Sequence, residues 1–380
     1  MSTLKVGGIR GVSASSDAIT VANDGTCTGN ITNNLSNRNL LINGACVISQ
    51  EANGAAVDGA TAEYAVDRTH VEGFVGGGTG TAQQVDDSPS GFTNSIKVTV
   101  TGTDTSLAAT DYYTLRQIIE GYNVRHLGFG AAGGTSVTLS FFVKSSLTGN
   151  FSCSLGNGGN SRSYPIMYTI NAANTWEKKT MTFPADDTGT WGTGNGRGFS
   201  VRWSMGAGSS ILGTANAWGA GQFHGATGTT NLFATNGATF QITGMQLEAG
   251  TIATDFEHRR FTDELALCQR YFCQYTGDNG DSFVPAGMTD SSTYYMYFSF
   301  PVPMRISPSF TGNAKAIRFH CDANNSNDKD FNTAFLFNPP TTANPSSLYL
   351  GIDSSGSQGG LAGEMQGRQD GIIAKFNAEM

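Results

Sequence analysis

Glycine is the residue that most limits what this chain can fold into. Of the 380 residues, 50 are glycine, nearly double the usual share of ~7%. The glycines are scattered among serine, threonine and asparagine without a Gly-X-Y repeat, which excludes a collagen triple helix. With 23 phenylalanines and 12 tyrosines, the chain is too aromatic to be disordered. Short strands joined by many tight turns fit this mixture, so we expect an all-β fold.

The charged residues argue against nucleic acid as a partner. Only 14% of residues are charged, and the formal net charge is −8. The longest basic runs are the pairs Lys178-Lys179 and Arg259-Arg260, whereas a nucleic-acid binder clusters such residues to displace counterions. No apolar stretch approaches the ~18 residues needed to cross a bilayer. The start, Met1–Val6, lacks the apolar core of a signal peptide. We therefore expect no membrane insertion and synthesis in a cytoplasm.

Strand patterns fill residues 37–256. The best is 136–144, which is apolar at successive positions, as expected of a strand inside a sandwich. Residues 95–100 alternate cleanly and predict a strand with one solvated face. Residues 112–119 fit a helix or a strand, and we favour a strand because no cap is visible. Further strands are expected at 175–183, 198–203 and 240–247.

One helix of ~10 residues is expected near Thr262. Thr262 can cap it, and Asp263 and Glu264 suit its positive first turn. The helix separates residues 37–256 from a second, smaller β-sandwich that spans 257–380. Its apolar stripe is expected to consist of Phe261, Leu265, Cys268 and Phe272.

Residues 1–36 form an extended leader with too few large apolar residues for a core of its own. We expect this leader either to wrap around copies of itself or to dock on another protein. The chain is thus predicted to consist of a docking and oligomerisation leader (1–36), a β-rich domain (37–256) and a C-terminal β domain (257–380).

Three blocks at the junction of the two β domains carry a resemblance. They are ITGMQLEAG at 242–250, TDFEHR at 254–259 and ELALCQRYF at 264–272. This arrangement resembles tail-fibre, head-fibre and similar virion proteins, found especially in marine and cyanobacterial phages. Further blocks that fit the same family are NLLING at 39–44, PVPMR at 301–305 and IAKFNAEM at 373–380.

The resemblance covers roughly residues 37–380. It implies a fold and a location in the virion, and it implies no catalysed reaction. It implies a jelly roll similar to carbohydrate-binding modules, then the helix and a small C-terminal domain. It also implies assembly into virions, often as trimers. Asn377 and Met380 depart from the family's usual Asp and Leu at the end of the chain, which casts no doubt on the fold. Because one fold serves many functions, the implied sugar binding is a hypothesis.

Catalytic and metal-binding motifs are missing from the sequence. HExxH, GxSxG and GxxxxGK[ST] are absent, and the GxGxxG match at 128–133 precedes a strand where a dinucleotide site needs a helix. The five histidines lack ligand-like spacing, and the six cysteines, without a CxxC pair, are expected to be free and mostly buried. Residues 322–330 alternate oxygen donors but lack the glycine and glutamate of a calcium loop, which favours a solvated turn. We expect no metal, no cofactor and no enzyme activity.

Adjacent carboxylates do not make a glycosidase pair. Such enzymes place two acids ~5–10 Å apart across a sugar bond, whereas neighbours in a strand point to opposite faces. The adjacent pairs in this chain are Asp86-Asp87, Asp186-Asp187 and Asp263-Glu264. Asp186-Asp187 is better interpreted as part of a turn, and Asp263-Glu264 as charges at the start of a helix.

Aromatic side chains are the best candidates for sugar binding, because they stack on the apolar faces of pyranose rings. Tyr164, Trp191, Trp203 and Trp218 lie in Gly/Asn/Ser-rich stretches typical of loop tips. Trp176 and Trp203 sit within strand patterns and are expected in the core. The candidate ligand-binding residues are therefore Trp191, Trp218 and Tyr164.

The leading hypothesis is a virion fibre or spike subunit that attaches the particle to a host surface glycan. In this hypothesis, residues 1–36 attach the subunit to other virion structural proteins. One alternative is a capsid decoration or head-fibre protein with a structural role. Another is a tailspike that degrades polysaccharide.

We predict that the protein is a homotrimer. The leader gains apolar burial only between chains, because it has too few large apolar residues to bury its own surface. Light scattering of the purified full-length protein should give three chains per particle. A stable monomer would contradict this prediction.

Overall fold

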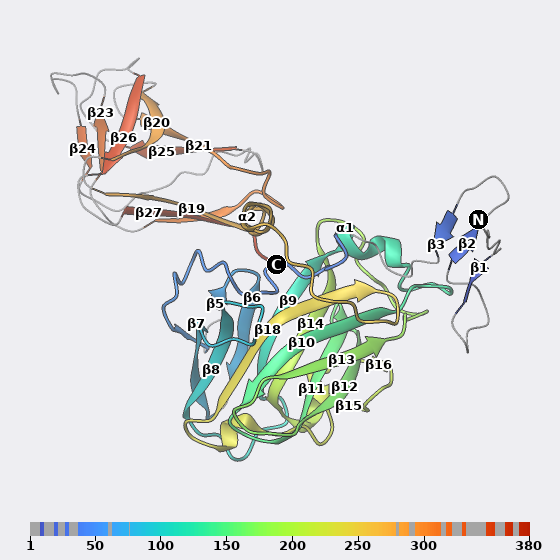
Figure 1. Cartoon of the computed structure of the whole chain (residues 1–380). Helices are drawn as coiled ribbons and strands as arrows, with labels where there is room; N and C mark the ends of the chain where they lie inside the picture. Colours follow the sequence, from blue (N-terminus) through green and yellow to red (C-terminus); the bar gives the residue numbers. More distant parts are fainter. Residues whose placement is uncertain are drawn as a thin grey trace, which may run out of the picture.

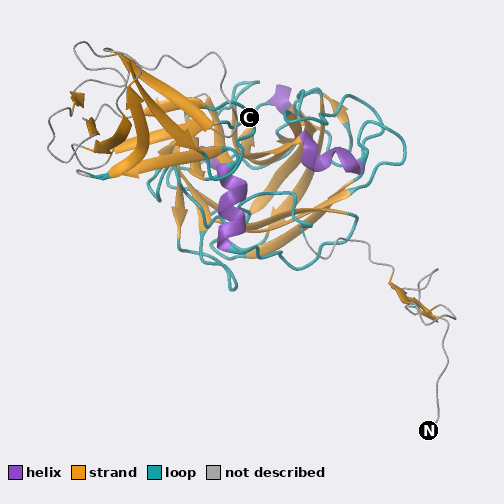
Figure 2. Cartoon of the chain, turned by 90° about the horizontal axis from the view of Figure 1, so that it is seen from above, coloured by secondary structure: helices purple, strands orange, loops and turns teal. Residues whose placement is uncertain are grey.

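The computed structural model describes most of the chain from residue 37 onward. The described residues are 8–10, 19–21, 27–29, 37–59, 63–75, 77–278, 281–288, 293–312, 317–320, 329–331, 347–353, 362–367 and 372–380. Strands make up most of the regular structure in these ranges (Figure 2). The α-helices within these described ranges are α1 (Gly121–Val124) and α2 (Phe261–Gln269). The prediction of an all-β fold is confirmed.

Two antiparallel sheets form the main domain (Figure 1). The six-stranded sheet consists of β4 (Val57–Asp58), β7 (Thr79–Val85), β8 (Ser95–Gly102), β10 (Val137–Ser145), β13 (Glu177–Phe183) and β18 (Thr239–Ala249). The seven-stranded sheet consists of β5 (Glu63–Val66), β6 (Thr69–Val75), β9 (Tyr112–Glu120), β11 (Gly149–Asn157), β12 (Arg162–Ile170), β14 (Arg197–Ala207) and β16 (Gly219–Ala220). Each strand expected within residues 37–256 is present.

The order of these strands is that of a jelly roll. Along the chain, β8 to β14 and then β18 pass back and forth between the two sheets. This produces the order β13-β10-β18-β8 in one sheet and β12-β11-β14-β9 in the other. Eight strands divided in this way between two facing sheets make a jelly roll, so that prediction is also confirmed.

Alternating side chains build the core between the sheets. Phe199, Val201 and Trp203 of β14 are buried in the same core as Leu139 and Phe141 of β10, and the ring centroids of Phe141 and Trp203 lie 6.0 Å apart. Each such side chain contributes about 1.5–3 kcal/mol to folding through its burial. Trp203 is fully buried, as expected from its strand pattern.

Short elements complete the first part of the chain. The glycines of the GxGxxG match, Gly128, Gly130 and Gly133, all have positive φ and lie in the turn before β10, which confirms the turn interpretation. The 3-10 turns are η1 (Arg125–Leu127), η2 (Ser209–Ile211) and η3 (Leu232–Ala234). The remaining strands are β1 (Gly8–Ile9), β2 (Ile19–Val21) and β3 (Cys27–Gly29), which form one small sheet, and the parallel pair β15 (Leu212–Gly213) and β17 (Gly225–Ala226).

The C-terminal strands form two sheets of their own beyond α2 (Figure 1). In the described ranges, no strand before α2 pairs with a strand after it. The domain boundary at 256/257 itself stays a prediction. One sheet consists of β19 (Phe272–Gly277), β22 (Ser309–Gly312) and β27 (Ile372–Asn377), and the other of β20 (Ser282–Met288), β21 (Thr293–Ser299), β23 (Ile317–His320), β24 (Lys329–Phe331), β25 (Ser347–Asp353) and β26 (Ala362–Gly367).

The helix α2 differs from its prediction in two ways. Its N-cap is Arg260, which makes no side-chain cap hydrogen bond, and Thr262 lies inside the helix, so the predicted cap is wrong. Phe261 is 60% exposed, and Phe272 belongs to β19, so the predicted apolar stripe is only partly right. Cys268 is fully buried because the helix packs this side against Ile42, Ile48 and Tyr271.

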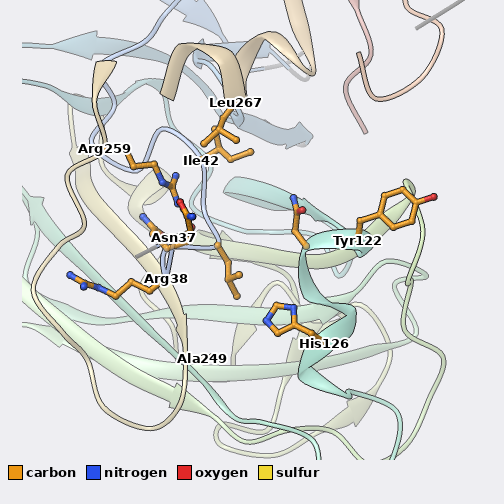
Figure 3. Close-up of a pocket in the computed structure, with 11 residues that line it drawn as sticks. Asn37, Arg38, Ile42, Tyr122, His126, Ala249, Arg259 and Leu267 are labelled. Carbon is orange, nitrogen blue, oxygen red and sulfur yellow. The ribbon is translucent and has the colours of Figure 1, made fainter. Parts of the chain in front are cut away.

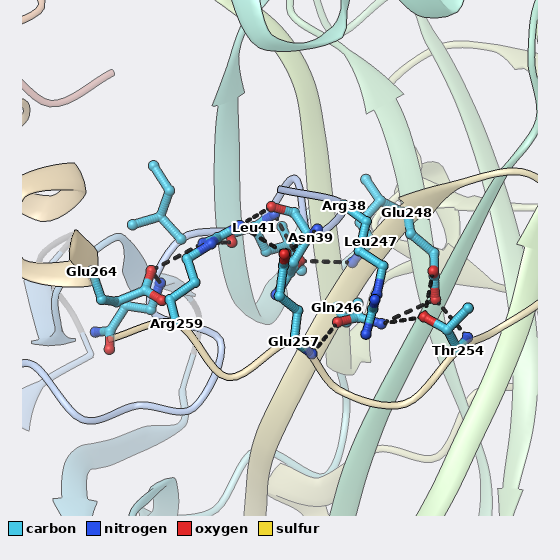
Figure 4. A network of polar contacts seen from close by, with 12 residues as sticks. Arg38, Asn39, Leu41, Gln246, Leu247, Glu248, Thr254, Glu257, Arg259 and Glu264 are labelled. Carbon is cyan, nitrogen blue, oxygen red and sulfur yellow. Dashed lines mark hydrogen bonds and ion pairs between the residues drawn. The ribbon is translucent and has the colours of Figure 1, made fainter. Parts of the chain in front are cut away.

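The junction motifs form a polar network that joins distant parts of the chain (Figure 4). The Arg259 guanidinium donates to the main-chain carbonyls of Asn39 and Leu41 and also contacts Glu264 at 3.2 Å. The Asn39 amide N–H donates to Glu257 (2.9 Å), and the Glu257 amide N–H donates to the side chain of Gln246 (2.8 Å). The motif residues therefore hold the opening of the domain, its last strand and α2 together.

A second set of contacts fixes the C-terminal region to the seven-stranded sheet. The buried carboxylate of Glu120 accepts hydrogen bonds from Arg270 (2.6 and 2.9 Å) and from the Tyr271 hydroxyl (2.9 Å). The hydrogen bond to Glu120 is the main cause that raises the pKa of Arg270. Arg68 pairs with Glu379 near the end of the chain.

We predict that Glu120→Ala destabilises the protein by about 1–3 kcal/mol, because it leaves the buried Tyr271 hydroxyl and the partly exposed Arg270 without their partner. Urea unfolding of the full-length protein measures this loss. The control is Asp86→Ala, which removes an exposed carboxylate and should change stability by less than about 0.5 kcal/mol. Equal stability of the two variants would contradict the prediction.

Candidate functional site

The three predicted ligand-binding residues lie together. The Trp218 ring centroid is 5.1 Å from that of Tyr164 and 5.5 Å from that of Trp191. Phe129 packs edge-on against both tryptophans. The indole N–H of Trp191 donates to the Thr188 carbonyl (3.1 Å) and that of Trp218 to the Pro184 carbonyl (3.2 Å).

This aromatic cluster extends the core. Only 8% of Trp191 and 9% of Tyr164 is exposed, so the expectation of exposed loop tips is wrong for these two residues. Trp218 is partly exposed, whereas the other two are buried. Trp176, expected in the core, instead precedes β13 and is partly exposed. Sugar binding by Trp191, Trp218 and Tyr164 stays a prediction.

A different group of residues lies on the outer face of the seven-stranded sheet. Cys153, Trp203, Leu115 and Val71 are buried in the core. Because neighbours in a strand point to opposite faces, the residues before and after each of these four point away from the core. The strand register places them in two rows. The first row is Ser154, Arg202, Arg116 and His70, and the second is Ser152, Ser204, Thr114 and Glu72.

We call these two rows the polar face. Its arginines are almost completely covered, since Arg116 is 3% and Arg202 1% exposed. Arg116 contacts Glu72 at 2.6 Å and donates to the Ser200 hydroxyl at 2.7 Å. Arg202 donates to Asn160 at 2.9 Å, and its Nε lies 3.9 Å from the second oxygen of Glu72.

The segment that carries His224 lies over the second row. A hydrogen bond of 3.2 Å links Thr114 Oγ1 and His224 Nδ1. The hydroxyl of Ser152 donates to Thr229 and accepts from the amide N–H of Ala226.

The polar face holds most of the buried polar atoms without a hydrogen bond in the described part of the chain. Ten side-chain atoms are of this kind, and six belong to the face. Each such atom costs about 1–3 kcal/mol, and native structures contain few of them. Their concentration on one face indicates a place where water or a ligand supplies the missing bonds. The six atoms are His70 Nε2, Glu72 Oε2, Arg116 Nη2, Ser154 Oγ, Arg202 Nε and Ser204 Oγ.

The electrostatics of the polar face are set by burial and by its arginines. Burial, followed by the nearby Arg116, lowers the pKa of Arg202 to about 9. Burial and the neighbouring arginines lower the pKa of His70 to about 3 and that of His224 to about 2. Both histidines are therefore neutral at neutral pH and offer a donor and an acceptor each.

Two tyrosines flank the polar face. The ring centroid of Tyr112 lies 4.2 Å from that of His224, and that of Tyr64 lies 5.2 Å from that of His70. Both tyrosines are partly exposed. They place partly exposed aromatic residues next to hydrogen-bonding groups, which is a combination that suits sugar binding.

Two hollows lie elsewhere, around Arg259 and Leu267. The first, of about 380 Å³, is shown in Figure 3 and is lined by residues that include Arg38, Tyr122 and His126. The second, of about 670 Å³, lies between α2 and Val302-Pro303. Among the described residues that line these two hollows, only one buried side-chain polar atom lacks a hydrogen-bond partner. This atom is Arg38 Nε, in the first hollow. The polar face is therefore the stronger candidate.

The described ranges offer neither a metal-binding cluster nor a membrane-spanning helix. These ranges hold no group of three His, Cys, Asp or Glu side chains suited to a metal. No helix among them has the length and apolarity needed to span a membrane. Cys46, Cys153, Cys268 and Cys273 are free and buried, as predicted for the cysteines. Residues 322–328, which make up most of the calcium-like stretch at 322–330, lie outside the described residues.

Comparison with known proteins yields solved structures of low similarity. No family model matches the chain, and no curated protein matches it significantly in sequence. The enzymatically active domain of tailspike protein 4 from bacteriophage CBA120 matches 56% of this chain at 12% identity and a TM-score of 0.30. That match spans 21% of the tailspike chain.

Carbohydrate-binding modules are also among the similar structures. TmCBM61 in complex with β-1,4-galactotriose matches 56% of this chain and 99% of its own, at 12% identity and a TM-score of 0.28. The family 11 module from Clostridium thermocellum, bound to a β-1,3-1,4-mixed-linked tetrasaccharide, matches 50% and 91%, at 14% identity and a TM-score of 0.26. At these TM-scores the likeness carries no argument about function, which is argued below from the residues.

We predict opposite effects on stability for two serines of the polar face. Ser154→Ala removes a buried hydroxyl without a partner and should leave stability unchanged or raise it by about 1 kcal/mol. Ser152→Ala removes a hydroxyl with two partners and should cost about 1–3 kcal/mol. Urea unfolding without added glycan measures both values. Equal losses in the two variants would show that Ser154 has a protein partner.

Proposed function

We propose that this chain is a non-catalytic subunit of a phage fibre or spike that attaches the particle to glycans on the host surface. The polar face of the seven-stranded sheet is the glycan-binding surface in this proposal.

The observation that carries the proposal is the set of six unpaired buried polar atoms on the polar face. A sugar hydroxyl both donates and accepts hydrogen bonds, so it suits the mixture of serine, histidine, arginine and glutamate found there. Tyr64 and Tyr112, which flank the face, offer rings on which a pyranose can stack. Few other ligand classes combine apolar ring faces with so many hydroxyls.

The proposed place in a phage particle rests on the sequence. The junction blocks at 242–250, 254–259 and 264–272 resemble those of virion fibre proteins. The network around Arg259 supplies a physical reason for these blocks, because they tie the jelly roll to α2. The homotrimer, and docking on other virion proteins through residues 1–36, belong to the same proposal.

Several copies per particle would compensate for a weak single site. One stacked aromatic contributes about 1 kcal/mol. Sites linked on one particle bind together and reach affinities that one site cannot reach alone. A fibre of three chains suits such a site.

The test is adsorption of phage particles that carry Ser154→Ala. This change removes an unpaired hydroxyl in the first row of the polar face, so adsorption to host cells should fall roughly tenfold, as expected for the loss of about 1.4 kcal/mol. The control is Trp176→Ala, which removes a partly exposed aromatic outside the polar face, and it should adsorb normally. Electron microscopy with a label on this subunit checks that assembly is intact.

Two outcomes would contradict the proposal. Unchanged adsorption after replacement of Ser154 would favour a capsid decoration protein. Release of new reducing ends from host surface polysaccharide would favour a polysaccharide-degrading tailspike.

A further inference from the structure

We infer that the ligand of the polar face carries a negatively charged substituent, bound between Arg116 and Arg202. The ligand class is thus an acidic glycan bearing carboxylate or sulfate groups. This inference rests on the proposed glycan binding and narrows it.

The two guanidinium groups lie next to each other. Arg116 on β9 and Arg202 on β14 are direct register partners in the antiparallel pair. Their side chains therefore leave the sheet on the same side, at neighbouring positions. Each has an N–H without a hydrogen-bond partner, on Nη2 of Arg116 and on Nε of Arg202.

The charge of this pair is only half balanced. Among the described residues, Glu72 is the one carboxylate within 4 Å of either guanidinium, at 2.6 Å from Arg116 and 3.9 Å from Arg202. His70 and His224 are neutral, and the charge of Arg197 adds a further positive field. Two buried positive charges thus share one negative charge, which is unfavourable until an anion is bound.

Three other arginines among the described residues each have a carboxylate of their own. These pairs are Arg162 with Asp186, Arg270 with Glu120 and Arg68 with Glu379. Arg68, the other buried arginine that the structure describes, is thus balanced by a carboxylate of its own, whereas Arg116 and Arg202 share one.

The neighbours of the arginine pair suit a sugar that carries the anion. Ser154 lies beside Arg202 in the register, and His70 lies beside Arg116. Both have an unpaired polar atom. An acidic group between the guanidinium groups would place the sugar hydroxyls within reach of these two side chains. Guanidinium groups bind carboxylate and sulfate through charge-assisted hydrogen bonds, which are stronger than those between neutral groups.

The experiment is binding of the full-length protein to an array of oligosaccharides in matched pairs, with a neutral and an acidic member on the same backbone. The acidic set contains both uronic-acid and sulfated members, which distinguishes the two sources of charge. Acidic members should bind roughly tenfold more tightly than their neutral partners. This preference should shrink as salt is raised, because screening weakens charge interactions.

Two variants localise the effect. Arg202→Gln should remove the preference for acidic members while neutral binding remains. Glu72→Gln removes the competing carboxylate and should increase binding of acidic members several-fold, which is a gain that a misfolded protein would not show. The control is Arg125→Gln, which changes an exposed arginine outside the polar face. This variant should prefer acidic over neutral oligosaccharides as strongly as the unchanged protein does.

The outcomes separate this inference from the proposed function. Binding of neutral and acidic members with equal affinity would overturn the inference and leave glycan binding in place. Reduced binding of acidic members by Glu72→Gln would also overturn it. Absence of binding to any member would overturn both.

Discussion

The contacts of Arg259 are the interaction on which the arrangement of the chain depends. Its guanidinium reaches the main chain at Asn39 and Leu41 and the side chain of Glu264. Glu264 in turn accepts from the amide N–H of Asn43. One side chain thus joins the opening of the jelly roll to the first turn of α2, from which the C-terminal sheets follow. Glu264, expected only as a helix-start charge, is nearly buried and structural. Arginine suits this role because its planar donors can satisfy several carbonyl and carboxylate oxygens at once.

The two faces of the seven-stranded sheet differ in the side chains that they bury. The inward residues, such as Val201 and Trp203, are apolar and stabilise the sandwich through burial. The outward residues, such as Ser204 and Arg202, are polar, yet they are buried as well and lack some of their hydrogen bonds. This arrangement costs stability. A protein keeps such a cost where a site has a function, because unsatisfied groups are ready to bind a ligand.

The expectation that Trp191 and Tyr164 are exposed is wrong for a physical reason. Glycine-rich surroundings suggested exposed loops around Trp191, but its ring packs against Phe129 and Phe199 and its indole N–H is already bonded. Composition describes the local chain and does not reveal what packs on it from elsewhere. In contrast, Arg116 and Arg202 gave no sequence signal of a site. They lie in separate strands, and an isolated arginine in a strand pattern is ordinarily a solvated residue.

The sequence by itself determined the all-β class, six of the eight jelly-roll strands and the position of α2, because these depend on local alternation, turn residues and helix-start charges. The strands β11 and β12 were not predicted. The tertiary structure decided which strands became neighbours. The pairing of β14 with both β9 and β11 brings Ser154, Arg202 and Arg116 into one row. A shift of one residue in either register would move that strand's side chains to the opposite face. The polar face and its excess positive charge therefore exist only in the folded sheet, since they depend on register between segments far apart in the chain.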